Sequence, residues 1–180
     1  SDVFIAKLNA DGSYAWAQQA GGSSYDYGYG ISALADGSSL ITGTFEGTAS
    51  FGSTTLTSAG DSDVFIAKLN ADGSYAWAQQ AGGSSYDYGY GISALADGSS
   101  LITGTFEGTA SFGSTTLTSA GDSDVFIAKL NADGSWDSTK TAVPTYELST
   151  SASRRNEGQW LKTTGSTSNV SQGTRLYWSL

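Results

Sequence analysis

The chain has 180 residues, a formal net charge of −9, and neither cysteine nor histidine. Its negative charge argues against binding to nucleic acid or to an anionic membrane surface, because like charges repel. The missing residue types exclude disulfides, Cys/His zinc sites and Ser-His or Cys-His catalytic pairs.

The composition favours strands over helices. Glycine accounts for 24 residues and proline for one, and only 14% of the residues are charged. Glycine together with β-branched and aromatic residues is typical of hairpins and pleated sheets. No run approaches the roughly 20 apolar residues that span a bilayer. We therefore predict an all-β protein without membrane insertion.

The chain is an internal repeat with a period of 61 residues. Residues 1–61 return without a change as residues 62–122, and a third copy runs from Ser123 to Ser135. Trp136 then stands where the repeat has tyrosine. A period of this size is typical of propeller blades, solenoid coils or array modules.

Each copy contains short strand-like runs that are separated by turn signals. DVFIAKL (2–8) has apolar residues on both faces, which predicts a strand covered on both sides. SYAWAQQAG (13–21) alternates large and small side chains. GISALAD (30–36) and SLITGTF (39–45) flank an Asp-Gly pair, for which we expect a hairpin with a type I′ turn. The run 49–60 is predicted as an outer strand or an ordered loop.

Repeated units of four antiparallel strands that hide both faces are the building blocks of a β-propeller. The predicted fold class is all-β, with four-stranded antiparallel β-propeller-like blades in tandem 61-residue repeats, and a β-solenoid is the alternative. The predicted parts are a half blade (1–22), a blade (23–83), a second blade (84–143) and a non-repeat, β-rich C-terminal tail (144–180).

The strand DVFIAKL, the tryptophan-bearing strand and a hairpin ending in Thr-Gly carry a resemblance. The positions concerned are Asp2, Phe4, Lys7, Leu8, Trp16, Gly21, Gly22, Asp26, Gly28, Asp36, Gly37, Thr42 and Gly43. Over residues 1–135 this pattern resembles the bacterial SBBP-type β-propeller repeat, although 37–40 read Gly-Ser-Ser-Leu where that family usually has Gly-Asn and an aromatic residue. The resemblance implies a propeller fold and an extracellular or cell-surface bacterial setting, and it brings no common chemistry.

The predicted function follows from the open ends of such an array. Propellers typically close with about 4–8 blades, so this chain needs partner strands from its tail or from another chain. Exposed edges and apolar faces favour association. We predict a structural, self-assembling protein that forms a homo-oligomer or filament through strand-edge and blade-face pairing. The candidate interface residues are Val3, Phe4, Ile5, Leu176, Trp178 and Leu180.

Two tyrosine–aspartate clusters suggest an alternative function, a multivalent carbohydrate-binding module. Their residues are Tyr25, Asp26, Tyr27 and Tyr29, and in the second copy Tyr86, Asp87, Tyr88 and Tyr90. Aromatic rings stack on the apolar faces of sugars, carboxylates accept hydroxyl hydrogen bonds, and repeated weak sites gain avidity. Tyrosine is also an ordinary packing residue with a polar end, which is the competing interpretation.

The sequence predicts no enzyme, no catalytic residue, no cofactor and no metal site. NADGS (9–13) and LADGS (34–38) contain fragments of a calcium loop but lack its twelfth-position glutamate, and turn formation explains them. Calcium held between acids of neighbouring blades is the alternative. Asp26 and Glu46 recur in each complete copy, so we expect them to serve the repeat rather than a single catalytic centre.

Overall fold

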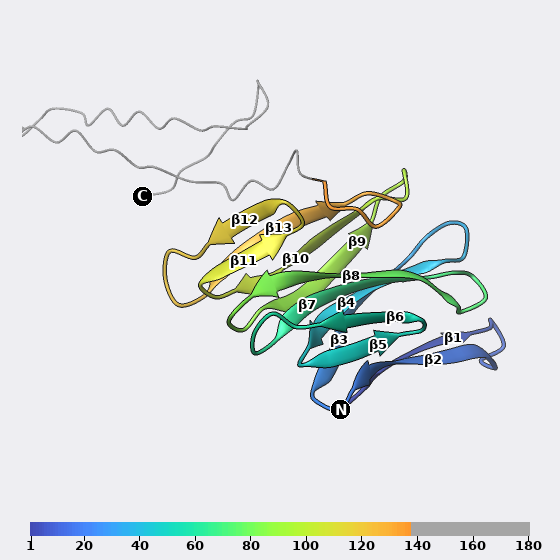
Figure 1. Ribbon diagram of the computed structural model, residues 1–180. Coiled ribbons are helices and arrows are strands. Elements are labelled where there is room, and N and C mark those ends of the chain that lie inside the picture. The colour runs from blue at the N-terminus through green and yellow to red at the C-terminus, as the bar shows by residue number, and fades with distance from the viewer. Residues whose placement is uncertain (138–180) are drawn as a thin grey trace, which may run out of the picture. The chain divides into compact units, whose positions relative to one another are not determined.

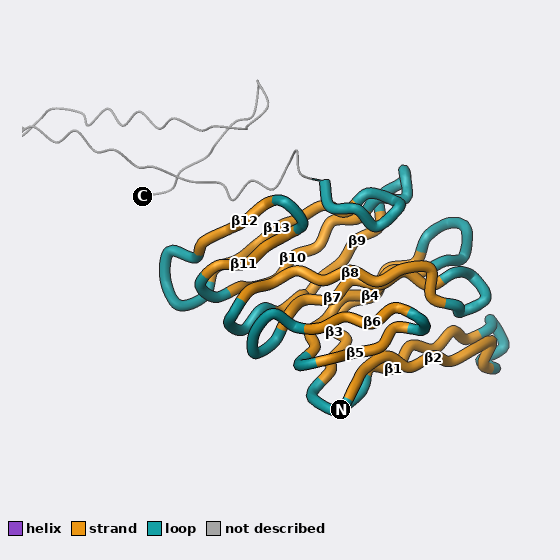
Figure 2. The backbone as a smooth tube through the Cα atoms, viewed as in Figure 1, coloured by secondary structure: helices purple, strands orange, loops and turns teal. Residues whose placement is uncertain are grey.

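The computed structural model describes residues 1–137, which form 13 β-strands and no helix (Figures 1 and 2). This confirms the all-β prediction. The first sheet has the order β1-β2-β5-β6. Its strands are β1 (Val3–Leu8), β2 (Tyr14–Gly22), β5 (Thr48–Phe51) and β6 (Thr54–Thr57).

The second and third sheets contain the remaining described strands. The second sheet has the order β12-β11-β8-β7-β4-β3, and the third has the order β13-β10-β9. The strands of the second sheet are β3 (Asp26–Ala33), β4 (Ser39–Phe45), β7 (Asp63–Leu69), β8 (Tyr75–Gly83), β11 (Thr109–Phe112) and β12 (Thr115–Thr118). Those of the third are β9 (Tyr88–Ala94), β10 (Ser100–Phe106) and β13 (Asp124–Leu130). All strand pairs among the described residues are antiparallel, and none of their sheets closes on itself. The predicted tail, residues 144–180, lies outside the described part.

A short hairpin in each copy joins one sheet to the next. The hairpin β5–β6 lies between β4 and β7 in the chain, yet it pairs with β2 of the first sheet, with Gly21 opposite Ser50. The hairpin β11–β12 pairs with β8 in the same way, with Gly82 opposite Ser111. The predicted run 49–60 therefore contains a hairpin edge rather than one outer strand. This explains why the observed sheets contain four, six and three strands.

The Asp-Gly turns are three-residue loops rather than type I′ turns. The Asn9 N–H donates to the Ser13 carbonyl at 2.8 Å, and the Gly12 N–H donates to the Asn9 carbonyl at 2.9 Å. The loop is therefore one residue longer than a two-residue turn, and Gly12 takes the left-handed conformation at φ 85°. The aspartate side chain accounts for the difference, because Asp11 Oδ1 accepts both the Ser13 N–H and the Ser13 hydroxyl.

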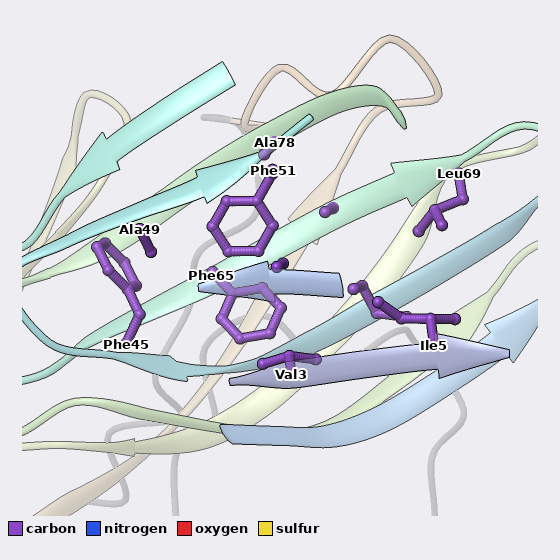
Figure 3. Close-up of a cluster of buried hydrophobic side chains, with 11 residues drawn as sticks. Val3, Ile5, Phe45, Ala49, Phe51, Phe65, Leu69 and Ala78 are labelled. Atoms are coloured by element: carbon purple, nitrogen blue, oxygen red, sulfur yellow. The ribbon is translucent and has the colours of Figure 1, made fainter. Parts of the chain in front are cut away.

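Two hydrophobic cores lie on the two sides of the second sheet. The first packs Val3 and Ile5 of β1 against Phe65, Ala67 and Leu69 of β7 (Figure 3). The second core contains the same residues 61 positions later, with Val64 and Ile66 packed against Phe126, Ala128 and Leu130. One packing arrangement is thus used twice, because identical sequences bury identical faces.

Trp136 occupies the place that the repeat gives to tyrosine. Tyr75 meets Phe51 edge to face at 6.2 Å, and Trp136 meets Phe112 edge to face at 5.5 Å. The larger ring therefore preserves the aromatic contact at the end of the third copy.

Candidate functional site: two open sheet faces and a tyrosine ladder

Six tyrosine rings form a continuous ladder along β3 and β9 and the residues just before each strand. Alternate residues of a strand share a face, so Tyr25, Tyr27 and Tyr29 stand side by side, with 6.2 Å between successive ring centroids. Tyr29 meets Tyr90 across the two sheets at 5.4 Å. The ladder continues from Tyr90 through Tyr88 to Tyr86 with spacings of 5.9 and 6.4 Å. The structure thus brings the two predicted tyrosine clusters together on one surface.

The aspartates of the predicted clusters do not lie with the tyrosines. Asp26 and Asp87 occupy the intervening positions, and their side chains are 1% and 0% exposed. Asp26 Oδ2 accepts the Gly22 N–H, and Asp87 Oδ2 accepts the Gly83 N–H, each at 2.8 Å. These carboxylates hold the backbone at the end of β2 and β8. A ligand on the ladder would meet phenol groups and ring faces without these two acids.

Asp87 lies beside a second buried acid, Asp63. A Cβ placed on Gly82 would be 2.7 Å from Asp63 Oδ1 and 2.8 Å from Asp87 Oδ2, so the two carboxyls flank this glycine. Burial raises the pKa of Asp63 to about 6. Burial also raises the pKa of Asp87 to about 6, against the lowering effect of the Gly83 and Glu107 N–H groups. Within residues 1–137, Asp63 Oδ1 has no hydrogen-bond partner, which is consistent with a protonated carboxyl.

Burial has a similar effect on two phenols of the ladder. It raises the pKa of Tyr29 and of Tyr88 above the usual value, and the neighbouring tyrosines, first of all Tyr90, add to the shift. Both groups therefore stay protonated at neutral pH and can donate hydrogen bonds.

The first open face belongs to the first sheet. Phe4, Leu8 and Tyr14 lie on the side that faces away from the second sheet, with exposed fractions of 82%, 54% and 73%. Val3 and Ile5 on the other side are buried within the chain. Of the three predicted interface residues in β1, only Phe4 is therefore available to a partner. Leu176, Trp178 and Leu180 lie outside the described residues.

The second open face belongs to the third sheet. Leu101, Val125 and Ile127 lie opposite the buried side of β10 and β13, with exposed fractions of 40%, 61% and 53%. Thr103 lies on the same side, opposite Ile127, and is also exposed. Sequence reasoning missed this face. The sequence does show apolar residues on both sides of DVFIAKL, but it does not show which side stays uncovered in the last copy.

The second sheet shows how these faces pack when both are covered. Phe65 and Leu69 correspond to Phe4 and Leu8 and are 0% exposed. The counterparts of the other open face, Leu40, Val64 and Ile66, are likewise at most 1% exposed. We name the surface formed by Phe4, Leu8 and Tyr14 the N-face, and that formed by Leu101, Val125 and Ile127 the C-face. Each carries residues that are interior in the middle copy.

The calcium-loop fragments are used as turns. Each aspartate in the five turns accepts the N–H and the hydroxyl of the serine two residues later, and these contacts lower the aspartate pKa. The residues concerned are Asp11, Asp36, Asp72, Asp97 and Asp133. Within the described residues, no group of three or more acidic side chains is arranged to hold a metal ion.

No protein-family model matches the sequence, and no curated protein matches it. Among residues 1–137, no helix is long and apolar enough to cross a membrane. The functional interpretation therefore depends on the geometry of the two open faces and the tyrosine ladder.

Proposed function

We propose that this protein is a structural, self-assembling repeat protein whose copies associate end to end, N-face against C-face. The units are propeller-like blades, and association continues the packing that already joins the three sheets. The observation that carries the proposal is the burial of identical residues in the middle copy. Phe65 is 0% exposed while Phe4 is 82% exposed, and Ile66 is 0% exposed while Ile127 is 53% exposed.

We expect the two faces to be complementary, because their counterparts already pack against each other within the chain. In the second core, the Val64 side of β7 packs against the Phe126 side of β13. The C-face presents the Val125 side of β13, and the N-face presents the Phe4 side of β1, so joining them reproduces this contact. Such an interface is heterologous, and it generates a ring if the rotation closes and a filament if it does not.

The expected association is weak and depends on salt. Full burial of a large apolar side chain contributes about 1.5–3 kcal/mol, and the exposed side chains of the two faces are already partly covered. The gain is comparable to the association cost of about 4–15 kcal/mol. Copies of net charge −9 also repel one another, and salt screens this repulsion. We expect reversible oligomers that grow with concentration and with ionic strength.

Sedimentation of charged variants tests the proposal. Phe4→Lys and Ile127→Lys each place a charge in one face, and Thr55→Lys places the same charge at an exposed position of β6. We expect the first two to lower the association constant at least about tenfold, because an unpaired charge in an apolar contact is costly, and the third to leave it unchanged. A protein that stays monomeric at high concentration and high salt would overturn the proposal.

The tyrosine ladder supports a second candidate function, carbohydrate binding. Five of its six rings are exposed by 41–57%, and the rings form one continuous strip. Aromatic platforms of this kind stack on flat apolar groups. A glycan array with the wild-type chain and the double variant Tyr27→Ala/Tyr88→Ala tests it. We expect binding that the double variant loses while its assembly is retained, and absence of any glycan signal removes this candidate.

A further inference from the structure

A groove runs along the free edge of β1. Val3–Ala6 line one side of it and Gly28–Ile31 of β3 line the other, with Ile41 also in the lining. Within the described residues, β1 pairs only with β2, so its second edge has no strand beside it. An unpaired edge next to an apolar groove is a template for another strand.

The second and third sheets show which strand fits such an edge. The corresponding edge of β7 pairs with β4 over seven residues, and that of β13 pairs with β10 over seven residues. In each case a phenylalanine lies opposite a glycine and covers it. A Cβ on Gly43 would be 2.7 Å from Phe65 Cε1, and a Cβ on Gly104 would be 2.8 Å from Phe126 Cε1. Only glycine leaves room for the ring, and within the described residues Phe4 has no such neighbour.

The neighbouring strand β3 contains further residues that lack their usual contacts. In the complete arrangement, a Cβ on Gly89 of β9 would meet Thr42 Oγ1, Val64 Cγ1 and the Gly43 carbonyl. The equivalent Gly28 meets only Val3 Cγ1. Ile92 packs against the second core, whereas the equivalent Ile31 is 60% exposed. The contacts missing around Gly28 are those that a strand like β4 makes, and the exposed Ile31 lines the same groove.

We propose that this groove is a strand-acceptor site and that its occupant is a β-hairpin with the sequence of residues 26–45. The inference rests on the proposed function in that both assign association to exposed sheet surfaces. The incoming strand runs antiparallel to β1, and its Thr-Gly-Thr segment places the glycine opposite Phe4 and the preceding threonine opposite Ile5. The register is that of β4 on β7.

The register is tested by disulfide trapping, for which the chain is suited because it contains no cysteine. Ala67 lies opposite Ile41, so Ala6→Cys is expected to face position 41 of a synthetic peptide of residues 26–45. Directly opposed side chains of an antiparallel pair have Cβ atoms about 4.5–5.5 Å apart, whereas neighbouring positions point to the other face. A peptide with Ile41→Cys should form the mixed disulfide at least about tenfold faster than one with Leu40→Cys.

The experiment uses the full chain with Ile127→Lys, which removes end-to-end association. Phe4→Ala is expected to weaken peptide binding about tenfold, since the ring loses its place over glycine, and Tyr14→Ala serves as the matched control on the same face. Equal trapping of the two cysteine peptides, or trapping no greater than with a scrambled peptide, overturns the strand-acceptor site. Those results leave the sedimentation test of the N-face and C-face unaffected, so the two proposals fail separately.

Discussion

The three copies of one phenylalanine provide an internal control for the packing. Phe4, Phe65 and Phe126 have the same sequence neighbours on both sides, and their exposed fractions are 82%, 0% and 0%. Phe→Ala in a core costs about 3–5 kcal/mol, because the burial of the ring is lost and a cavity remains in its place. Substitution of a surface residue usually changes stability by less than about 0.5 kcal/mol. We therefore expect Phe65→Ala and Phe126→Ala to be strongly destabilised and Phe4→Ala to be nearly neutral.

The isoleucine that follows each phenylalanine shows the opposite order of exposure along the three copies. Ile5 and Ile66 are 4% and 0% exposed, whereas Ile127 is 53% exposed. Substitution with alanine should cost about 2–5 kcal/mol at the two buried positions and clearly less at the third. The two series together distinguish which side of each sheet is covered.

Urea unfolding at low micromolar protein concentration measures both series, because association is then negligible. The midpoint should shift without a change in the slope with denaturant, since the surface exposed on unfolding is similar. If all three phenylalanine variants lose the same stability, the first sheet is covered on both sides and the assignment of the N-face is wrong.

Two further predictions concern the buried acids. Asp63 and Asp87 have pKa values of about 6 in the folded chain against an ordinary value of 3.8, so their contribution to stability is complete below pH 3.8 and is lost as the pH rises through 6, by up to about 3 kcal/mol for one carboxyl. Unfolding between pH 4 and 7.5 should show this decrease, Asp87→Asn should reduce it, and stability that rises with pH would contradict the buried pair. Gly82→Ala should destabilise the chain by about 1–3 kcal/mol, because φ is +151° and the new Cβ meets both carboxyls. Gly12→Ala, at φ +85° with nothing within 4 Å, should cost about 1 kcal/mol in the same urea assay, and equal losses at the two glycines would argue against crowding at Gly82.

Much of the strand pattern can be predicted from the sequence, because it depends on local alternation. The runs at 2–8, 13–21 and 39–45 correspond to β1, β2 and β4. The turn type could not be predicted from Asp-Gly alone, because it also depends on the following serine, whose N–H and hydroxyl donate hydrogen bonds to the aspartate carboxylate. Nor does the sequence show that β5–β6 pairs with the preceding sheet, since the alternation in β5 indicates which face is buried but not which strand lies beside it.

The candidate site was predictable in part. The spacing of Tyr25, Tyr27 and Tyr29 places them on one face of a strand. The same alternation places Asp26 on the opposite face, although the sequence prediction grouped it with the tyrosines. The meeting of Tyr29 with Tyr90 depends on how two sheets pack. The exposure of Phe4 and Ile127 cannot be read from local sequence at all, because the same heptapeptide is buried in the middle copy.

The mass of a mixture of the two blocked variants tests the central claim most directly. Phe4→Lys retains only the C-face and Ile127→Lys retains only the N-face, so each alone should sediment as a monomer at a concentration and ionic strength at which the wild type associates. Mixed in equal amounts, they should form a one-to-one dimer that grows no further. Dimers formed by either variant alone, or a mixture that remains monomeric, would contradict the pairing of these two faces.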